Sequence, residues 1–283
     1  MTARAASASL SENSQSESDG SDLSAAGKTP AAFCFVGTKQ LIVYHYGDMI
    51  SDAMDKLITL YHGSKHIVKE PVFGEGRRNN DFGLGFYCTE NPDLAKEWAV
   101  TSLRNGFANR YTMNTEDMRI LNLCSSEYSI LNWIAILVEH RLFSVRTPVA
   151  RRAMHYLIDN YSVNVNAYDI VVGYRADDSY FDFAEAFLNN SITVNQLANA
   201  MYLGKLGEQF VLKSRFAFSK LRFEDFDNAD GSIFYVKRKI RDEAARKQYL
   251  ELLEQEDDGL FIQDIIREKI KKDDSRIPGI LHR

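Results

Sequence analysis

A histidine followed by a glycine ends a β-prone run in the segment Leu60-Tyr61-His62-Gly63-Ser64. An imidazole ring can hydrogen-bond a sugar hydroxyl, and a glycine lets a flat ligand approach backbone groups closely. His62, Gly63 and Ser64 are therefore candidate binding residues. The alternative is a histidine that only completes its hydrogen bonds at a strand end, as most buried polar groups do.

Two glycines lie beside two aromatic residues in the segment Asp81 to Thr89, which reads D-F-G-L-G-F-Y-C-T. The glycines permit a tight backbone turn and leave an aromatic ring free to stack on a planar group. Phe82, Gly85 and Tyr87 are the candidate ligand contacts in this segment. Alternatively, its aromatic residues belong to the core of a strand.

An acidic pair, Asp177 and Asp178, follows the short apolar strand predicted at Asp169 to Val172. A loop after a strand is a suitable place for a general base, so Asp178 is a candidate catalytic residue. A solvated acidic loop or a helix cap is the competing interpretation. No metal site is predicted, because His62 and His66 lack the carboxylate pattern of a zinc-binding helix.

The elements that position these residues are strands and helices in irregular succession along the chain. This order predicts an α+β fold. Asn91 and Pro92 start a helix that is expected to pack on the sheet through Trp98. Thr193 and Gln196 have the spacing of a capping box and start another helix. The remaining predicted elements are strands at Leu57 to His62 and at Glu208 to Leu212, ahead of the segment Phe216 to Phe223, and helices at Ile130 to Val138 and at residues 149 to 159.

Composition divides the chain into four parts. Residues 1–30 are rich in serine, alanine and acidic residues and are predicted to be a disordered leader. Residues 31–54 are predicted to form a β-hairpin or a connecting segment. Residues 55–226 carry all of the motifs and form the predicted main domain, and residues 227–283 are predicted to be a charged helical extension.

Charge and composition exclude several functional classes. With 34 basic and 39 acidic residues the net charge is −5, and no basic stripe suits nucleic acid. Three widely spaced cysteines indicate reduced thiols rather than a disulfide framework. No apolar run reaches the roughly 20 residues of a membrane span, so a soluble protein is expected.

Taken together, the segments Leu60 to Ser64 and Asp81 to Thr89 resemble the His-Tyr branch of the ADP-ribosyltransferase superfamily, and five segments in order carry a closer resemblance. The segments are L-Y-H-G-S at Leu60 to Ser64, D-F-G-x-G-F-Y-x-T at Asp81 to Thr89, A-x-x-W-A at Ala95 to Ala99, the Y-D-I-V-V-G stretch at Tyr168 to Gly173 with A-D-D after it, and Q-F-V at Gln209 to Val211. The resemblance is closest to a group of small bacterial proteins of unknown function, and it covers residues 57 to 224.

The resemblance implies a split β-sheet core with packed helices, folded around NAD as co-substrate. His62 would bond a ribose hydroxyl, Gly63 would hold the nicotinamide carboxamide through its backbone, and Tyr87 would stack on the nicotinamide ring. The neighbouring Arg77 or Arg78 could contact the pyrophosphate, because a guanidinium fits phosphate geometry well.

One departure from the family concerns its catalytic glutamate, whose carboxylate stabilises the charge that develops as nicotinamide leaves. The matching residue here is Gln209, which accepts a hydrogen bond but carries no charge. Glu208 is adjacent, but neighbours on a strand point to opposite faces. It could substitute only through a bulge or a shifted register.

The function expected from the resemblance is transfer of ADP-ribose from NAD to a macromolecular acceptor, a protein rather than a nucleic acid, by a bacterial toxin or effector. A regulatory module that binds NAD or ADP-ribose without turnover and an NAD glycohydrolase are the alternatives. The expected location is the cytoplasm, or a host cell after export, with no membrane partner. A cognate neutralising protein is a partner compatible with a toxin.

Overall fold

The computed structural model describes residues 57–144, 146–176, 178–203 and 207–278. All of them belong to the second of the two units into which the chain divides, Tyr46–Arg283. The predicted leader at 1–30 and the predicted hairpin at 31–54 lie outside the described residues. The described part of the chain is α+β, as predicted, with two small sheets and eight α-helices.

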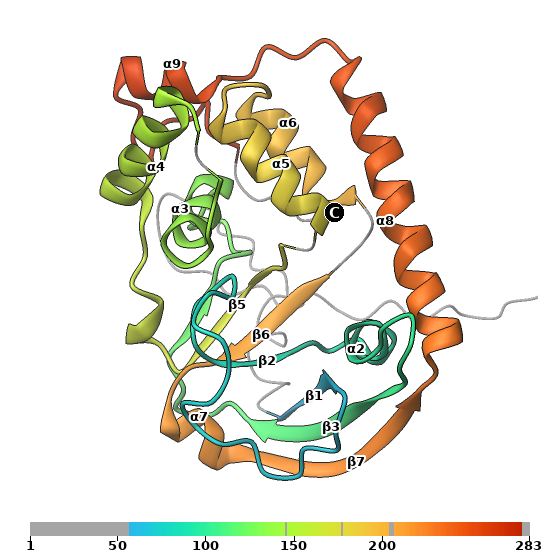
Figure 1. Ribbon diagram of the computed structural model, residues 1–283. Coiled ribbons are helices and arrows are strands. Elements are labelled where there is room, and N and C mark those ends of the chain that lie inside the picture. The colour runs from blue at the N-terminus through green and yellow to red at the C-terminus, as the bar shows by residue number, and fades with distance from the viewer. Residues whose placement is uncertain (1–56, 145, 177, 204–206, 279–283) are drawn as a thin grey trace, which may run out of the picture. The chain divides into compact units, whose positions relative to one another are not determined.

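The strands form one sheet of three and one of four strands (Figure 1). The first is antiparallel, in the order β1-β3-β7, with β1 at Leu57–Ser64, β3 at Gly106–Asn114 and β7 at Leu221–Ala229. The second has the order β2-β6-β5-β4, with β2 at Phe86–Cys88, β6 at Glu208–Leu212, β5 at Ile170–Tyr174 and β4 at Ile120–Asn122. Among the described strands, β4 and β5 form the only parallel pair.

The two sheets meet where β1 reaches the end of β2. The peptide N–H of Tyr61 donates to the carbonyl of Thr89 at 2.7 Å, and the N–H of Thr89 donates back at 3.0 Å. This reciprocal pair is a single antiparallel bridge, after which the strands diverge. The end of β1 therefore lies beside the four-stranded sheet although it is paired with β3.

The helices occupy Pro92–Ala99 (α2), Ile130–His140 (α3), Pro148–Tyr161 (α4), Asp178–Leu188 (α5), Val194–Ala200 (α6), Arg215–Lys220 (α7), Gly231–Leu253 (α8) and Ile262–Glu268 (α9), and a short 3₁₀ turn occupies Val165–Ala167. The predicted starts are confirmed. The Asn91 side chain accepts hydrogen bonds from the backbone N–H groups of Asp93 and Leu94, and Thr193 and Gln196 form a reciprocal capping box.

Alternation along β5 and β6 creates two apolar layers. Val171 and Val211 face the helices and join the larger core, which contains the fully buried Trp133 of α3. Ile170 and Leu212, one position along each strand, face the three-stranded sheet. Figure 1 shows α3, α5 and α6 on one side of β5 and β6 and the three-stranded sheet on the other. A residue on β6 therefore faces one layer or the other according to its parity.

Helix α2 packs closely on the three-stranded sheet through glycines. A Cβ at Gly63 would overlap the carbonyl oxygen of Ala95, and one at Gly106 would overlap the carbonyl oxygen of Ala99. The helix buries Ala95 and Ala99 on this side. The predicted contact through Trp98 is not the closest one, because the small residues Ala95 and Ala99 make the close approaches to the sheet, and Trp98 lines a pocket.

The C-terminal part is helical, as predicted, but it also contributes to the sheet and the core. The segment Phe216 to Phe223 is divided between α7 and β7, and β7 continues past the expected boundary at residue 226 to Ala229. Ile262, Ile265 and Ile266 of α9 are buried in the larger core. Among the described residues, no helix has both the length and the apolar character that a membrane crossing requires.

Candidate functional site

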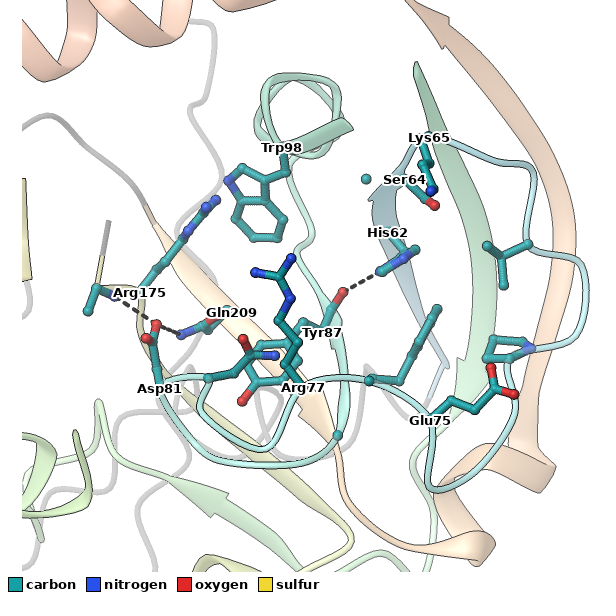
Figure 2. Close-up of a pocket in the computed structure, with 18 of the residues that line it drawn as sticks. His62, Ser64, Lys65, Glu75, Arg77, Asp81, Tyr87, Trp98, Arg175 and Gln209 are labelled. Carbon is teal, nitrogen blue, oxygen red and sulfur yellow. Dashed lines mark hydrogen bonds between the residues drawn. The ribbon is translucent and has the colours of Figure 1, made fainter. Parts of the chain in front are cut away.

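A pocket of about 890 Å³ opens where the two sheets meet (Figure 2). Its walls come from the end of β1, the loop between β1 and β2, the strands β2 and β6, and Trp98 of α2. This volume lies within the range of small-molecule sites, roughly 300–1,000 Å³. Among the described residues, the pocket contains residues from the motifs at Leu60 to Ser64, Asp81 to Thr89, Ala95 to Ala99 and Gln209 to Val211.

The His62 ring is fixed in one orientation on this wall. Its Nδ1 donates to the carbonyl oxygen of Tyr87 at 2.7 Å, and the ring stacks on Phe86 with centroids 4.3 Å apart. In the neutral ring, a proton on Nδ1 leaves Nε2 as an acceptor. Burial lowers the pKa of His62, although the hydrogen bond to Tyr87 opposes this effect. His62 is therefore an oriented neutral acceptor at neutral pH.

Gly63 presents backbone groups to the same space. Peptide groups two residues apart on a strand point to the same side, so the N–H and C=O of Gly63 are directed like those of Tyr61, toward β2. Beyond the bridge to Thr89 the strands diverge, and Gly63 lines the pocket. Ser64 lines it as well, with its hydroxyl accepting from the N–H of His66 at 3.2 Å.

Tyr87 is held by the loop that precedes it. Its hydroxyl donates to the carbonyl of Gly83 at 2.6 Å and accepts from the N–H of Phe82 at 3.1 Å. Burial raises the pKa of this phenol well above its ordinary value. Two hydrogen bonds at its tip fix the ring, which lines the pocket and offers a flat surface.

The loop itself is anchored by Lys213, which directly follows β6. Lys213 Nζ donates to the carbonyl oxygens of Phe82 and Leu84, each at 2.7 Å. Gly85 lies so close to β6 that a Cβ would come within 2.6 Å of Val211 Cγ1. Gly83 has a φ of 72°, in the left-handed region that favours glycine. Gly83 therefore permits the turn, and Gly85 permits the close approach to β6.

Gln209 lies at the base of the pocket with a defined amide orientation. Its Nε2 donates to Asp81 Oδ2 at 3.0 Å and to the carbonyl oxygen of Tyr174 at 3.1 Å. Asp81 also accepts from the N–H of Ala176 at 2.9 Å and from Arg141 Nη1 at 3.1 Å. Burial raises the pKa of Asp81, against these hydrogen bonds and the positive charges around it.

Two predicted site residues, Phe82 and Glu208, lie away from the pocket, and the side chain of a third, Asp178, is not among those described. Phe82 is fully buried in the larger core, where its ring packs against Gly173, so it is not a ligand contact. Glu208 faces the other side of β6, beside Cys124, in the register that strand alternation requires. Asp178 is the first residue of α5, and its side chain, like Asp177, lies outside the described residues.

The pocket is rich in positive charge although the chain is acidic. Among the described residues, five basic side chains line it, against the two carboxylates of Glu75 and Asp81. The basic residues are Lys65, Arg77, Arg141, Arg175 and Arg238. The guanidinium of Arg175 lies over the Trp98 ring, 4.1 Å from its centroid. Figure 2 shows Arg77 extending into the space between Trp98 and Tyr87. Such a lining suits an anionic ligand with planar groups.

A family described as "Protein of unknown function (DUF3990)" matches residues 58–223, more than half of the chain. The chain belongs to this family. Comparison with curated proteins and with solved structures finds no match.

The region matched by DUF3990 contains His62, Tyr87 and Gln209 together with the loop that holds them. Arg238, which comes from α8, lies outside that region and still lines the pocket. Among the described residues, no group of three or more His, Cys, Asp or Glu side chains is placed to hold a metal ion.

The lining residues that sequence reasoning did not propose as site residues include Asp81, Trp98, Arg175 and Arg238. Asp81 opens a motif that was recognised, and Arg175 closely follows the end of a predicted strand, where polar residues gather at binding sites. A search for charged residues at strand ends would have found Arg175. Arg238 gives no such signal, because it is one of many charged residues on a long helix.

Proposed function

We propose that the protein transfers ADP-ribose from NAD to a macromolecular acceptor and releases nicotinamide. The observation that carries the proposal is the convergence of His62, Tyr87 and Gln209 on one pocket. These residues are separated by 25 and 122 positions in the sequence, and each lies on a different strand around the junction of two sheets. Two sheets that diverge beside this pocket are consistent with the split core expected of ADP-ribosyltransferases.

The lining of the pocket matches the chemistry of a dinucleotide. Arg77 and Arg175 are guanidinium groups suited to the pyrophosphate, and the rings of Tyr87 and Trp98 offer surfaces for planar bases. His62 is held as an acceptor for a ribose hydroxyl, and the backbone of Gly63 offers one donor and one acceptor for a carboxamide. An anionic molecule with two flat rings uses all of these features.

The reaction balances without a further reagent. The bond between the nicotinamide nitrogen and C1′ of its ribose breaks, and its electron pair leaves with nicotinamide, which becomes neutral. A nucleophilic oxygen or nitrogen of the acceptor bonds to C1′ and gives up a proton. Positive charge develops on the ribose during this step, and acceptors that face it stabilise the transition state.

Binding without turnover is the second candidate function. Gln209 favours it, because a neutral amide stabilises developing positive charge less than a carboxylate does. Such a protein would bind NAD or ADP-ribose and act as a regulatory or interaction module. The same pocket and the same cationic residues would serve it.

Labelled NAD distinguishes these functions. Purified full-length protein is incubated with NAD labelled in the adenylate part and a cell lysate, and both labelled macromolecules and free nicotinamide are followed. His62→Ala and Tyr87→Ala are compared with Tyr128→Ala, a partly buried tyrosine that does not line the pocket. We expect label transfer by the wild type and by Tyr128→Ala, with a large loss in the two pocket variants.

Each other result has a definite meaning. Nicotinamide release with free ADP-ribose and no labelled macromolecule would assign NAD hydrolysis. NAD binding without nicotinamide release would assign the binding module. If His62→Ala and Tyr87→Ala both bound NAD as tightly as the wild type, the NAD site would lie elsewhere.

A further inference from the structure

The amide of Gln209 is held with its oxygen, not its nitrogen, free for the pocket. Both hydrogens of Nε2 have acceptors, Asp81 Oδ2 at 3.0 Å and the carbonyl oxygen of Tyr174 at 3.1 Å. Since the amide group is planar, Oε1 points away from these two acceptors. Both neighbouring oxygens at this end of the amide can only accept a hydrogen bond, so this end must carry the NH₂ group. Gln209 therefore offers a fixed acceptor, as an ionised glutamate would.

The carboxylate that Gln209 lacks is present in its hydrogen-bond partner. Asp81 is only 5% exposed, and its oxygens accept from the Ala176 N–H, the Gln209 amide and the Arg141 guanidinium. All three partners are donors, so a carboxyl proton would have no acceptor among them. The hydrogen bonding thus favours an ionised Asp81, although burial raises its pKa. The negative charge lies one hydrogen bond behind the Gln209 amide.

We propose that Asp81 is a positioning residue that acts through Gln209. Asp81 would supply the negative electrostatic field that the catalytic glutamate of ADP-ribosyltransferases supplies directly. Asp81 fixes the amide so that Oε1 faces the developing charge on the nicotinamide ribose. A donor bonded to an anion also becomes more polarised, which makes the amide oxygen a stronger acceptor. This inference rests on the proposed function and explains how a glutamine serves where a glutamate is expected.

Variants that move the negative charge between positions 81 and 209 test the pair. Asp81→Asn removes the charge, Gln209→Glu places a second carboxylate about 3 Å from the first, and the double variant Asp81→Asn/Gln209→Glu moves the single charge to position 209. We expect each single variant to lose at least tenfold in kcat for nicotinamide release, with a smaller change in KM. The double variant should exceed both single variants.

The pH profile adds a readout that a purely structural role would not change. Protonation of Asp81 removes the negative charge, so kcat falls as pH drops through the raised pKa of this carboxyl, above the ordinary range of an aspartate near 3.9. The charged and titratable groups that face it are Arg141, Arg175 and Tyr87. Neither arginine loses its charge at acidic pH, but His62 in the same pocket also gains a proton there. The part of the acid limb that Asp81 contributes should therefore vanish in Asp81→Asn, while the part that His62 contributes remains in both proteins.

Asp93→Asn is the matched control, because Asp93 is an exposed carboxylate of α2 that pairs with Lys237 outside the pocket. It should keep wild-type kcat. Urea unfolding of every variant shows whether a loss of kcat reflects unfolded protein, and the double variant keeps the test valid if Asp81→Asn alone unfolds.

Several outcomes overturn the inference. They are an Asp81→Asn variant with wild-type kcat, a Gln209→Glu variant faster than the wild type, and a double variant no better than either single one. NAD binding by the wild type without nicotinamide release would also overturn it. Wild-type protein that neither binds nor cleaves NAD would overturn the proposed function itself.

Discussion

Lys213 connects the aromatic loop to the strand that carries Gln209. Its ammonium group donates to two loop carbonyls, and burial lowers its pKa to about 8 from an ordinary value near 10.5. Between these two values the unfolded chain binds more protons than the folded chain, so the contribution of Lys213 to the free energy of unfolding rises with pH.

The pH dependence of stability therefore reports on this lysine. We expect the difference in unfolding free energy between wild type and Lys213→Met to grow as pH increases from about 8 to 10.5. Urea unfolding at several pH values measures it, and the tyrosines that also titrate there are the same in both proteins. Parallel curves for the two proteins would show that Lys213 titrates as it does in the unfolded chain.

Arg77 and Arg78 are neighbours with different positions. Both are exposed, but only Arg77 lines the pocket. If Arg77 bonds the pyrophosphate, Arg77→Ala should weaken NAD affinity by about tenfold or more, the value of a charge-assisted hydrogen bond. Arg78→Ala should leave it unchanged. Calorimetric titration with NAD measures both, and equal losses would indicate a general electrostatic effect instead of a contact.

At the scale of single residues, short motifs predicted part of the pocket lining and not all of it. His62, Gly63 and Tyr87 could be predicted because their residue types have chemical meaning within short segments, whereas Gln209 was indicated only by the family resemblance. Phe82 could not be distinguished from them, because the turn at Gly83 sends its ring into the core while Tyr87 faces the pocket. The role of Asp81 depends on partners from three distant segments, which local sequence does not reveal.

At the scale of elements, the position of α2 determines whether Trp98 reaches the pocket. The helix lies against the three-stranded sheet at Gly63 and Gly106, where its carbonyl oxygens approach the strand backbone. Any side chain at these glycines must push the helix outward. The indole ring would move with it, and so would the Arg175 guanidinium that lies over the ring.

We therefore expect Gly106→Ala to reduce stability by about 1–3 kcal/mol, as overpacking does. It should also weaken NAD binding although Gly106 does not line the pocket. Ser64→Ala is the control for stability, because it adds no atoms and loses one exposed hydrogen bond on the neighbouring strand. Urea unfolding measures the stability, and calorimetric titration with NAD measures the affinity. Wild-type stability for Gly106→Ala would mean that α2 shifts without cost.

Helices were predicted correctly where an N-terminal capping residue was followed by apolar residues at helical spacing. The starts of α2 and α6 follow from Asn91 with Pro92 and from Thr193 with Gln196, since these residues satisfy helix N-termini locally. Which face a helix buries is decided by its neighbours, so the sequence assigned Trp98 to the sheet. The division of residues 216–223 between α7 and β7 likewise depends on pairing with β3.

At the scale of the whole described unit, the C-terminal segment belongs to the core. The hydroxyls of Tyr156 and Tyr161 on α4 both donate to the carbonyl oxygen of Ile270, each at 2.8 Å. Ile265 is fully buried, whereas Ile240 on α8 is 62% exposed. A charged composition hid this difference from sequence analysis, because a few buried isoleucines among many charged residues resemble a solvated helix.

The two isoleucines provide a matched test of this architecture. Ile265→Ala should lower the free energy of unfolding by about 2–5 kcal/mol, because it leaves a cavity in the main core. Ile240→Ala should change it by less than about 0.5 kcal/mol. A chain ended at residue 226 should fail to fold, since it removes the last residues of β7 as well as α9. If that shortened chain instead folded with the stability of the full chain, the helical segment would be an appendage, and NAD binding by the shortened chain would show that Arg238 is dispensable.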